Sequence, residues 1–148
     1  MNKLIFFAMF LVIISCSDSG YVQTEESKKI LKLLEANDFR YINFSEYGGN
    51  DWSKVCFLGP YNEQSEEILG FSWYISEHTN VLKSDGHNVI VFAVNDRVIE
   101  YIVHSRVYGD FWKLSGKCYP RESSQFINEK ETGNWGNYVH KPCPQKWC

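Results

Sequence analysis

The sequence has little of what membrane-spanning and nucleic-acid-binding proteins require. Its longest uninterrupted apolar run, residues 4–14, has eleven residues, whereas a transmembrane helix needs about 20. Lys and Arg number 15 against 18 Asp and Glu, and the net charge at pH 7 is −3. Because the chain has no basic patch, it lacks the electrostatic footprint of a nucleic-acid-binding protein, and no nucleic-acid partner is expected.

Recognisable catalytic motifs are also missing. The four histidines form no HExxH pair, and the sequence contains no GxSxG, SxxK or P-loop pattern. The adjacent Glu66 and Glu67 would point about 100° apart on a helix, so their carboxylates would not face one substrate. The sequence therefore predicts a protein that is not an enzyme and that uses no cofactor or metal.

What the sequence does contain begins with a secretion signal. A short, positively charged start precedes residues 4–14, which have the length of a signal-peptide h-region. The residues that end this segment, Ile13-Ile14-Ser15-Cys16, resemble the bacterial lipobox. The resemblance implies cleavage after Ser15, lipidation of Cys16 and acylation of its new amine, and more than one acyl chain anchors a protein stably. The alternative is a short buried helix with an unrelated cysteine.

This interpretation divides the chain into three parts. Residues 1–15 are the signal peptide, residues 16–23 are a lipidated tether, and residues 24–148 form one domain with an irregular tail from about residue 120. Ser17 follows the lipidated residue, where an Asp would imply retention in the inner membrane. The resemblance therefore implies a protein of the cell envelope, anchored in the outer membrane and facing the periplasm if the host is Gram-negative.

The remaining cysteines agree with export. Cys56, Cys118, Cys143 and Cys148 are even in number, which in an exported domain predicts two disulfides. Four cysteines allow three pairings, and the sequence alone does not choose among them. We expect Cys56–Cys118 with Cys143–Cys148, because the first two lie in or beside predicted strands and the last two are close in sequence. A zinc site that uses His140 and the last two cysteines lacks a fourth ligand at useful spacing.

Helical and strand patterns can be distinguished along the domain. Thr24 predicts the N-cap of a helix over about 25–37, with an apolar face at helical spacing. A shorter helix is predicted around residues 66–69, ended by Gly70. Further strands are predicted at residues 40–44, 55–58 and 71–75, and one more within 111–119.

The clearest signal is a β-hairpin. Residues 89–94 and 97–104 are rich in β-branched and aromatic side chains, and residues 95–96 form a turn of two favourable residues. The purer core face of the second strand is formed by Ile99, Tyr101 and Val103. His104 is expected on the more polar face.

The order of these elements predicts the fold class. Strands and helices do not alternate strictly, which favours an α+β fold over an α/β fold. We expect an antiparallel sheet of about 4–5 strands with helices packed on one face, braced by disulfides.

One spaced motif supports this fold and compartment. The stretch Trp52-x-x-Val55-Cys56-x-x-x-Pro60-Tyr61, with the segments that follow it up to about residue 120, resembles a group of small, uncharacterised bacterial exported proteins and lipoproteins. The motif carries no catalytic chemistry, so the resemblance implies an exported domain and no particular activity.

A second, shorter motif suggests a binding role. Ser115-Gly116-x-x-Tyr119 resembles the SGxxY loop with which bacterial periplasmic and membrane-bound lysozyme inhibitors enter the lysozyme cleft. The alternative is a turn that leads into Cys118.

Aromatic residues are the remaining positive signal. Trp, Tyr and Phe make up 16% of the chain, and Trp and Tyr are residues that protein-binding surfaces use. Those outside the predicted strands are candidate contact residues, the alternative being packing in the core or tail. They are Trp112, Trp135, Tyr138 and Trp147.

Three functions follow from these features. The first is a lipid-anchored binding module that faces the periplasm and has a protein partner, for example an immunity protein or an inhibitor of a toxin or lytic enzyme. The second is a structural lipoprotein in envelope assembly. The third is a small hydrolase, which would require a deep polar pocket with perturbed titratable groups.

Overall fold

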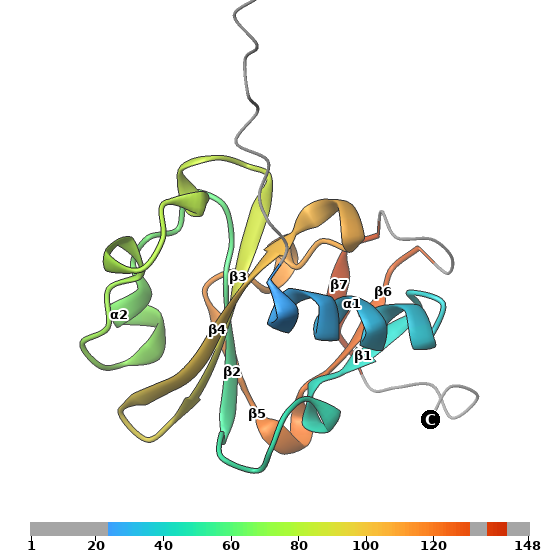
Figure 1. Cartoon of the computed structure of the whole chain (residues 1–148), viewed down its shortest axis with the longest axis horizontal. Helices are drawn as coiled ribbons and strands as arrows, with labels where there is room; N and C mark the ends of the chain where they lie inside the picture. Colours follow the sequence, from blue (N-terminus) through green and yellow to red (C-terminus); the bar gives the residue numbers. More distant parts are fainter. Residues whose placement is uncertain (1–23, 131–135, 142–148) are drawn as a thin grey trace, which may run out of the picture.

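The computed structural model describes residues 24–130 and 136–141, which form an α+β fold with two antiparallel sheets (Figure 1). The larger sheet has the strand order β4-β3-β2-β5. Its strands are β2 (Lys54–Leu58), β3 (His87–Val94), β4 (Arg97–Ser105) and β5 (Lys117–Pro120). The predicted α+β class and antiparallel pairing are confirmed.

A second, smaller sheet lies beside the first in the fold. It has the order β1-β6-β7 and consists of β1 (Tyr41–Asn43), β6 (Gln125–Asn128) and β7 (Tyr138–His140). The expectation of an irregular tail from about residue 120 was therefore wrong. These strands have only three or four residues, which is too short for a period-two pattern to identify them. β6 is the central strand and pairs with β1 on one side and with β7 on the other.

The predicted helices are present. Helix α1 (Glu25–Ala36) is capped by Thr24, whose hydroxyl accepts a hydrogen bond from the Ser27 N–H, and it buries Ile30 and Leu34. Helix α2 (Ser65–Leu69) ends at Gly70, which has a φ of +80°. The two helices cover opposite faces of the four-stranded sheet, α1 together with the small sheet on one side and α2 on the other (Figure 1).

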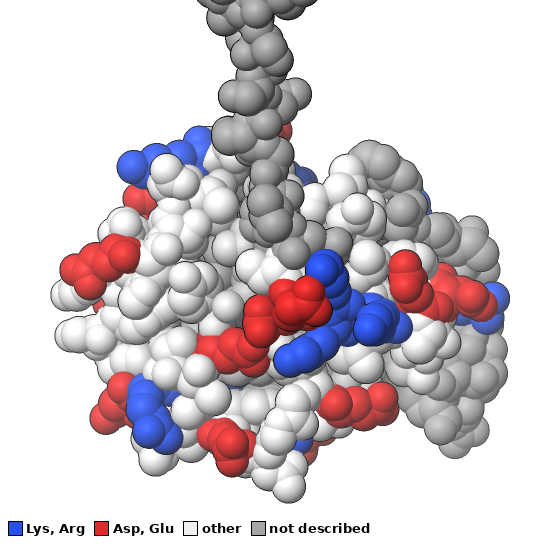
Figure 2. All heavy atoms as spheres, viewed as in Figure 1, with Lys and Arg blue, Asp and Glu red and all other residues white. Residues whose placement is uncertain are grey.

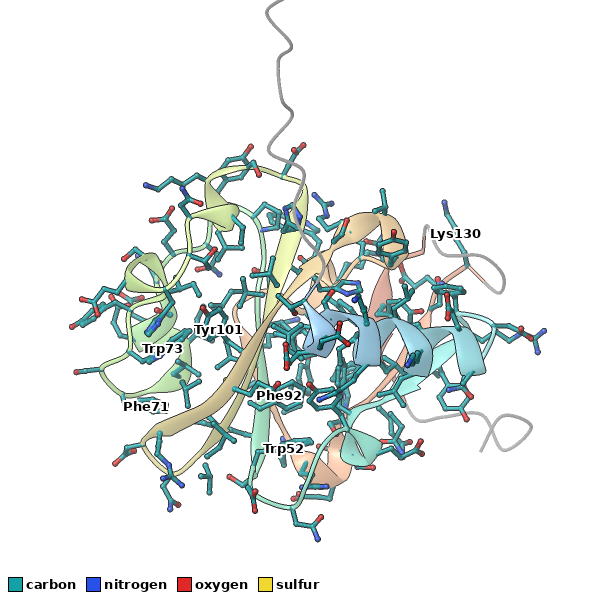
Figure 3. All side chains as sticks on the ribbon, viewed as in Figure 1. Trp52, Phe71, Trp73, Phe92, Tyr101 and Lys130 are labelled. Atoms are coloured by element: carbon teal, nitrogen blue, oxygen red, sulfur yellow. A yellow bond between two sulfur atoms is a disulfide. The ribbon has the colours of Figure 1, made fainter. Side chains whose placement is uncertain are left out.

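Two hydrophobic clusters result, one on each side of the four-stranded sheet. The larger contains Trp52 and Phe92, and the smaller contains the aromatic side chains of Phe71 and Trp73 (Figure 3). The predicted disulfide Cys56–Cys118 is confirmed and lies in the smaller cluster, where it joins directly paired positions of β2 and β5. Cys16 and the predicted Cys143–Cys148 bond fall outside the described residues.

Residues 71–75 are not the strand that their composition predicted. The Ser65 hydroxyl donates to the Trp73 carbonyl at 2.6 Å and accepts from the Ile75 N–H at 2.8 Å. These two backbone groups are thus satisfied by a side chain of α2 instead of a neighbouring strand. The segment consequently forms a loop that covers the sheet with its aromatic side chains.

The predicted hairpin is confirmed. One extra residue in β4, however, changes which of its side chains point to which face of the sheet. Phe92 pairs with Glu100 and Ala93 with Val98, so Ile99 is an extra residue in a β-bulge. The bulge leaves Ile99 38% exposed, whereas Ile102 and His104 are buried. The assignment of Ile99 to the core and of His104 to a polar face was therefore wrong.

Gly109 occupies a position that only glycine suits. Its φ is +119°, and a Cβ there would lie 2.6 Å from Cε2 of the buried Tyr138. We expect Gly109→Ala to lower the free energy of unfolding by about 2–4 kcal/mol, combining backbone strain with overpacking. Gly86 is the matched control, since it has an ordinary φ and no atom near the added methyl. Urea unfolding should show Gly86→Ala within about 1 kcal/mol of the wild type, and equal effects at both sites would contradict this account.

Within residues 24–130 and 136–141, no helix combines the length and the apolarity that a bilayer span requires.

Candidate binding groove

The most distinctive surface feature lies on β4, at one edge of the four-stranded sheet. β4 is the edge strand, and no described strand pairs with its outer side. It has nine residues, whereas the opposite edge strand, β5, has four and ends at Pro120. Because proline and short length protect an edge from further pairing, β4 is the edge better suited to receive another chain.

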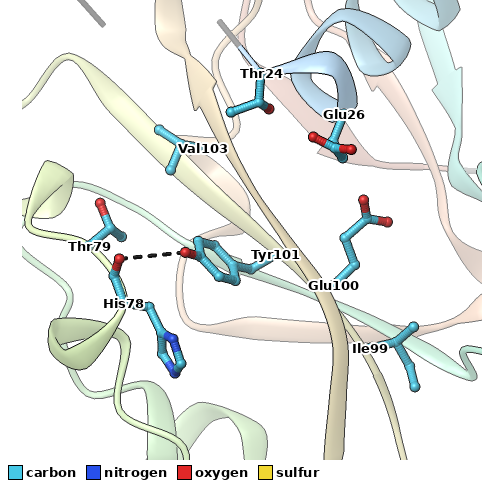
Figure 4. Close-up of a pocket in the computed structure, with 8 residues that line it drawn as sticks. All are labelled: Thr24, Glu26, His78, Thr79, Ile99, Glu100, Tyr101 and Val103. Atoms are coloured by element: carbon cyan, nitrogen blue, oxygen red, sulfur yellow. Dashed lines mark hydrogen bonds between the residues drawn. The ribbon is translucent and has the colours of Figure 1, made fainter. Parts of the chain in front are cut away.

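A groove runs along β4. One depression, of about 450 Å³, is lined on β4 by Ile99, Glu100, Tyr101 and Val103. One rim lies at the start of α1 and the other at His78 and Thr79 (Figure 4). A second depression, of about 470 Å³, continues past Ile99 toward the hairpin turn and Asp51. The two share Ile99, and together we call them the β4 groove.

The groove has an acidic wall. Glu26 on α1 and Glu100 on β4 lie on the same side, and Glu100 Oε1 accepts a hydrogen bond from the Tyr47 hydroxyl at 3.1 Å (Figure 4). Burial raises the pKa of Tyr47, and the charges of Glu100 and Glu26 raise it further. Figure 2 shows acidic side chains gathered where the start of α1 meets β4. This wall therefore presents carboxylates, and the lysines of α1 lie close beside them.

The other wall is aromatic. Tyr101 points away from the acidic side and its hydroxyl lies 3.5 Å from the His78 carbonyl (Figure 4). The His78 ring stacks on Trp73 with 4.7 Å between centroids, and Tyr101 lies 5.5 Å from His78 and 5.8 Å from Trp73. These rings give an apolar surface that is fixed in place by its own packing.

The SGxxY residues lie away from this groove and contact their own chain. Ser115 Oγ accepts hydrogen bonds from the Gly59 N–H at 2.9 Å and from the Asn62 amide at 3.3 Å. Gly116 has a φ of +78° and its N–H donates to the Phe57 carbonyl. Tyr119 is half-buried, and burial raises its pKa. These contacts fit a turn that leads into β5, which is the alternative that the sequence left open.

The aromatic candidates divide between surface and core. Trp112 is 48% exposed and its ring covers Gly59, where a Cβ would lie 2.9 Å from Trp112 Cε3. Tyr138 is fully buried, its ring stacks on Phe111, and its hydroxyl donates to the Phe39 carbonyl. A surface-binding role for Tyr138 was therefore wrong, because its strand β7 forms part of the core. Trp135 and Trp147 fall outside the described residues.

Two titratable groups with shifted pKa values outside the groove, Asp110 and His104, make structural contacts. Burial alone would raise the pKa of Asp110, but hydrogen bonds from Arg106, the Trp112 N–H and Asn88 outweigh it and lower that pKa. The Arg106 guanidinium forms an ion pair with Asp110 at 2.6 Å. Burial lowers the pKa of His104 to about 4, and His104 Nε2 lies 3.0 Å from the Gly109 carbonyl. His104 is 1% exposed, so it cannot contact a substrate.

His104 gives the domain a defined pH dependence. His104 stays neutral in the folded protein. The same histidine in the unfolded chain is therefore protonated at a higher pH, as the pH falls below about 6.5. Stability is therefore full above that pH and falls toward pH 4, with a loss on the order of 3 kcal/mol. We expect His104→Gln to have a lower free energy of unfolding than the wild type at pH 7. Between pH 7 and pH 4, that free energy should fall less in the variant than in the wild type. Parallel curves of unfolding free energy against pH for the two proteins would contradict this.

The described part of the chain holds no group of three or more His, Cys, Asp or Glu side chains arranged to bind a metal ion. Sequence reasoning missed Glu26, Ile99 and Glu100 as surface residues of a site. The sequence around Glu26 predicted only a capped helix, and the sequence around Ile99 and Glu100 predicted only a half-buried strand. No sequence pattern near Ile99 predicts the β-bulge that exposes it. Only the position of β4 at the sheet edge brings the three together.

Comparisons of the chain with protein-family models, with curated proteins and with solved structures found no significant match.

Proposed function

We propose that this protein is a lipid-anchored, non-enzymatic module of the bacterial cell envelope that binds a protein partner in the β4 groove. The observation that carries the proposal is the depression on the edge strand β4, which has Glu26 and Glu100 on one side and Tyr101 and His78 on the other. A surface that combines charged and aromatic side chains in this way is suited to contact with another protein. Immunity to a toxin and inhibition of a lytic enzyme are the partner relationships that we favour.

The position of the groove relative to the proposed anchor supports this function. Thr24 lies on the groove rim, and residues 17–23 join it to Cys16. Eight extended steps span at most about 28 Å. A partner in the groove would therefore be held close to the membrane that carries the anchor, where an incoming toxin or lytic enzyme would be intercepted.

The anchor is tested separately from the groove. We expect the wild-type protein to incorporate labelled palmitate and to sediment with membranes, and Cys16→Ser to do neither. Cys143→Ser is the control, because it removes a cysteine without touching the lipobox. Membrane sedimentation and labelling of Cys16→Ser at wild-type levels would overturn the lipoprotein assignment.

Partner binding is tested with a change at the centre of the groove. Ile99 is exposed, so Ile99→Lys should fold normally while placing a charged side chain on the groove floor. Affinity capture from the native envelope should recover a partner with the wild type and with Trp112→Lys, but not with Ile99→Lys. A partner that is retained by Ile99→Lys and lost by Trp112→Lys would move the site to the surface around Trp112.

A further inference from the structure

We infer that the loops at one end of the four-stranded sheet rest on the lipid bilayer that carries the anchor, with Tyr61, Val107 and Trp112 at the bilayer surface. This inference rests on the lipid anchor of the proposed function and adds a second, non-covalent contact with the lipid, which fixes the orientation of the domain. Three observations carry it. The loops at this end are joined by hydrogen bonds, they expose large apolar side chains, and the chain enters the domain beside them.

The antiparallel pairing of the sheet brings three segments to the same end. β2 and β4 both run antiparallel to β3, so they end where β3 begins, and β5 also begins there because it is antiparallel to β2. The segments are residues 59–64 after β2, residues 79–86 before β3 and residues 106–116 between β4 and β5. The segments before β3 and after β4 lie at the top of the domain in Figure 1. We call the three segments together the loop end.

Hydrogen bonds hold these segments in a fixed relation. The Tyr61 N–H donates to the Leu82 carbonyl at 2.6 Å, which joins the segment after β2 to the one before β3. The Arg106 N–H donates to the Gly86 carbonyl at 3.1 Å, which joins the segment before β3 to the one after β4. The loop end is therefore preformed, and contact with a bilayer would not require these loops to be ordered first.

The loop end exposes side chains that suit a membrane surface. Tyr61 is 69% exposed, Trp112 48% and Val107 40%. Trp112 lies over Gly59, two residues before Tyr61, so the two aromatic residues belong to adjoining parts of the surface. Tryptophan and tyrosine combine an apolar ring with a polar N–H or O–H group, and they are enriched at the boundary between lipid headgroups and acyl chains.

The backbone of Tyr61 also points to an external contact. Its φ is +62°, in the left-handed region that bulky residues rarely adopt. The exposed ring gains little from packing within the domain that could offset this strain. Strained backbone of this kind is found preferentially at binding sites, and a bilayer gives the Tyr61 ring a surface to contact.

The chain enters the domain beside the loop end. Thr24 lines the same depression as Val103 and Thr79, and it lies near Val103, toward the C-terminal end of β4 (Figure 4). The hairpin turn at the opposite end is about seven residues of β4 away from Val103, or roughly 23 Å. Cys16 lies at most about 28 Å from Thr24. The hairpin end would therefore reach the bilayer only with a nearly fully extended tether, whereas the loop end needs no such extension.

The charges of the loop end are mixed in sign. Exposed Lys83 and Lys117 lie at this end together with exposed Glu63 and Asp85. Because the signs offset each other, attraction to a strongly charged partner contributes little. The contact therefore depends on the apolar side chains, and we expect it on uncharged lipid.

This orientation agrees with the proposed function. Ile99 is nearer to the hairpin turn than Val103 is, and the second depression continues from Ile99 toward that turn. With the loop end on the bilayer, this part of the β4 groove faces away from the lipid. A partner that arrives through the periplasm could then reach it.

Brominated lipid measures the contact, because bromine atoms in the acyl chains quench tryptophan fluorescence at short range. The mature lipidated protein is placed in nanodiscs of uncharged phosphocholine lipid, either plain or brominated. Since the indole of Trp112 lies at the headgroup boundary, the wild type should be quenched at least about twofold more than Trp112→Phe. Trp73→Phe is the matched control, because it removes a tryptophan of the smaller hydrophobic cluster and should be quenched as strongly as the wild type.

A pair of double variants tests whether the neighbouring side chains share the contact. Tyr61→Ser/Val107→Ser removes two apolar side chains from the loop end and should reduce the quenching roughly by half, because bilayer binding scales with apolar area. Tyr74→Ser/Ile99→Ser removes two exposed apolar side chains outside the loop end and should leave the quenching unchanged. Because all four side chains are exposed, both variants should keep the wild-type unfolding midpoint within a few degrees.

Capture in nanodiscs and quenching report separately on the anchor and on the contact. Captured wild-type protein that is quenched no more than Trp112→Phe would overturn the bilayer contact and leave the proposed function standing. Protein that is not captured would overturn the lipid anchor, and this inference with it. Quenching that appears only when anionic lipid is added, or equal losses in the two double variants, would overturn a contact made by Tyr61, Val107 and Trp112.

Discussion

Removal of the Cys56–Cys118 disulfide by Cys56→Ala/Cys118→Ala is expected to lower the free energy of unfolding by about 4 kcal/mol. The bond closes a loop with a sequence separation of 62 residues, and the chain-entropy model assigns about this value to a loop of that length. The two Cα atoms are 4.0 Å apart at directly paired positions. The short edge strand β5 is thereby fixed to β2 in the sheet.

The other predicted disulfide provides the comparison for this measurement. Cys143 and Cys148 would close a loop of only a few residues, so Cys143→Ala/Cys148→Ala should cost about 2 kcal/mol in the same model. Guanidinium unfolding of both double variants, under oxidising conditions, measures the difference. Costs of equal size would contradict the chain-entropy account, and a cost below about 1 kcal/mol for Cys56→Ala/Cys118→Ala would remove the bond as a main stabilising contact.

Phe44→Ala is expected to destabilise the domain by about 3–5 kcal/mol, the usual range for truncating a buried phenylalanine. Phe44 is fully buried, and it contacts four other rings whose centroids lie 5.8–5.9 Å away. These are Phe57, Phe92, Phe111 and Phe126. Because Phe57 and Phe92 belong to the large sheet and Phe126 to the small one, the cavity would separate the two sheets from each other.

An exposed aromatic residue is the control for Phe44. Tyr61 is 69% exposed, and Tyr61→Ala should change the unfolding free energy by less than about 0.5 kcal/mol. Thermal and urea unfolding with near-ultraviolet circular dichroism follow both variants. A loss below about 1.5 kcal/mol for Phe44→Ala would mean that the sheets are held together by other contacts.

Strong local patterns predicted the elements that they encode. Helix α1 follows from Thr24 and an apolar face, and the β3–β4 hairpin follows from two β-rich runs around residues 95–96. The apolar run of β2 also predicted a buried strand, and Cys56–Cys118 was the pairing that we expected among the three that four cysteines allow. In each case, the interaction that determines the element joins residues close in sequence, or it involves cysteine, which in an exported domain forms disulfides.

Elements that depend on distant contacts were not predictable in this way. β6 forms between β1 and β7, which are distant from each other in sequence, and residues 71–75 form a loop in which Ser65 bonds the Trp73 carbonyl and the Ile75 N–H. The groove was missed for the same reason, since Glu26 and Glu100 are far apart in sequence and Ile99 is exposed by a bulge. Each of these features depends on contacts between residues that are distant in sequence. Hydrophobic periodicity and secondary-structure propensity do not encode such contacts.

The central claim is that a protein partner occupies the β4 groove of the anchored module. The most direct test replaces Ile99 with a photo-cross-linking amino acid in the lipidated protein and irradiates intact cells, with the same substitution at Trp112 as the control. The account predicts one main protein adduct from position 99 and none from position 112. Adducts from position 112 alone, or none from either position under conditions where the partner is expressed, would contradict it.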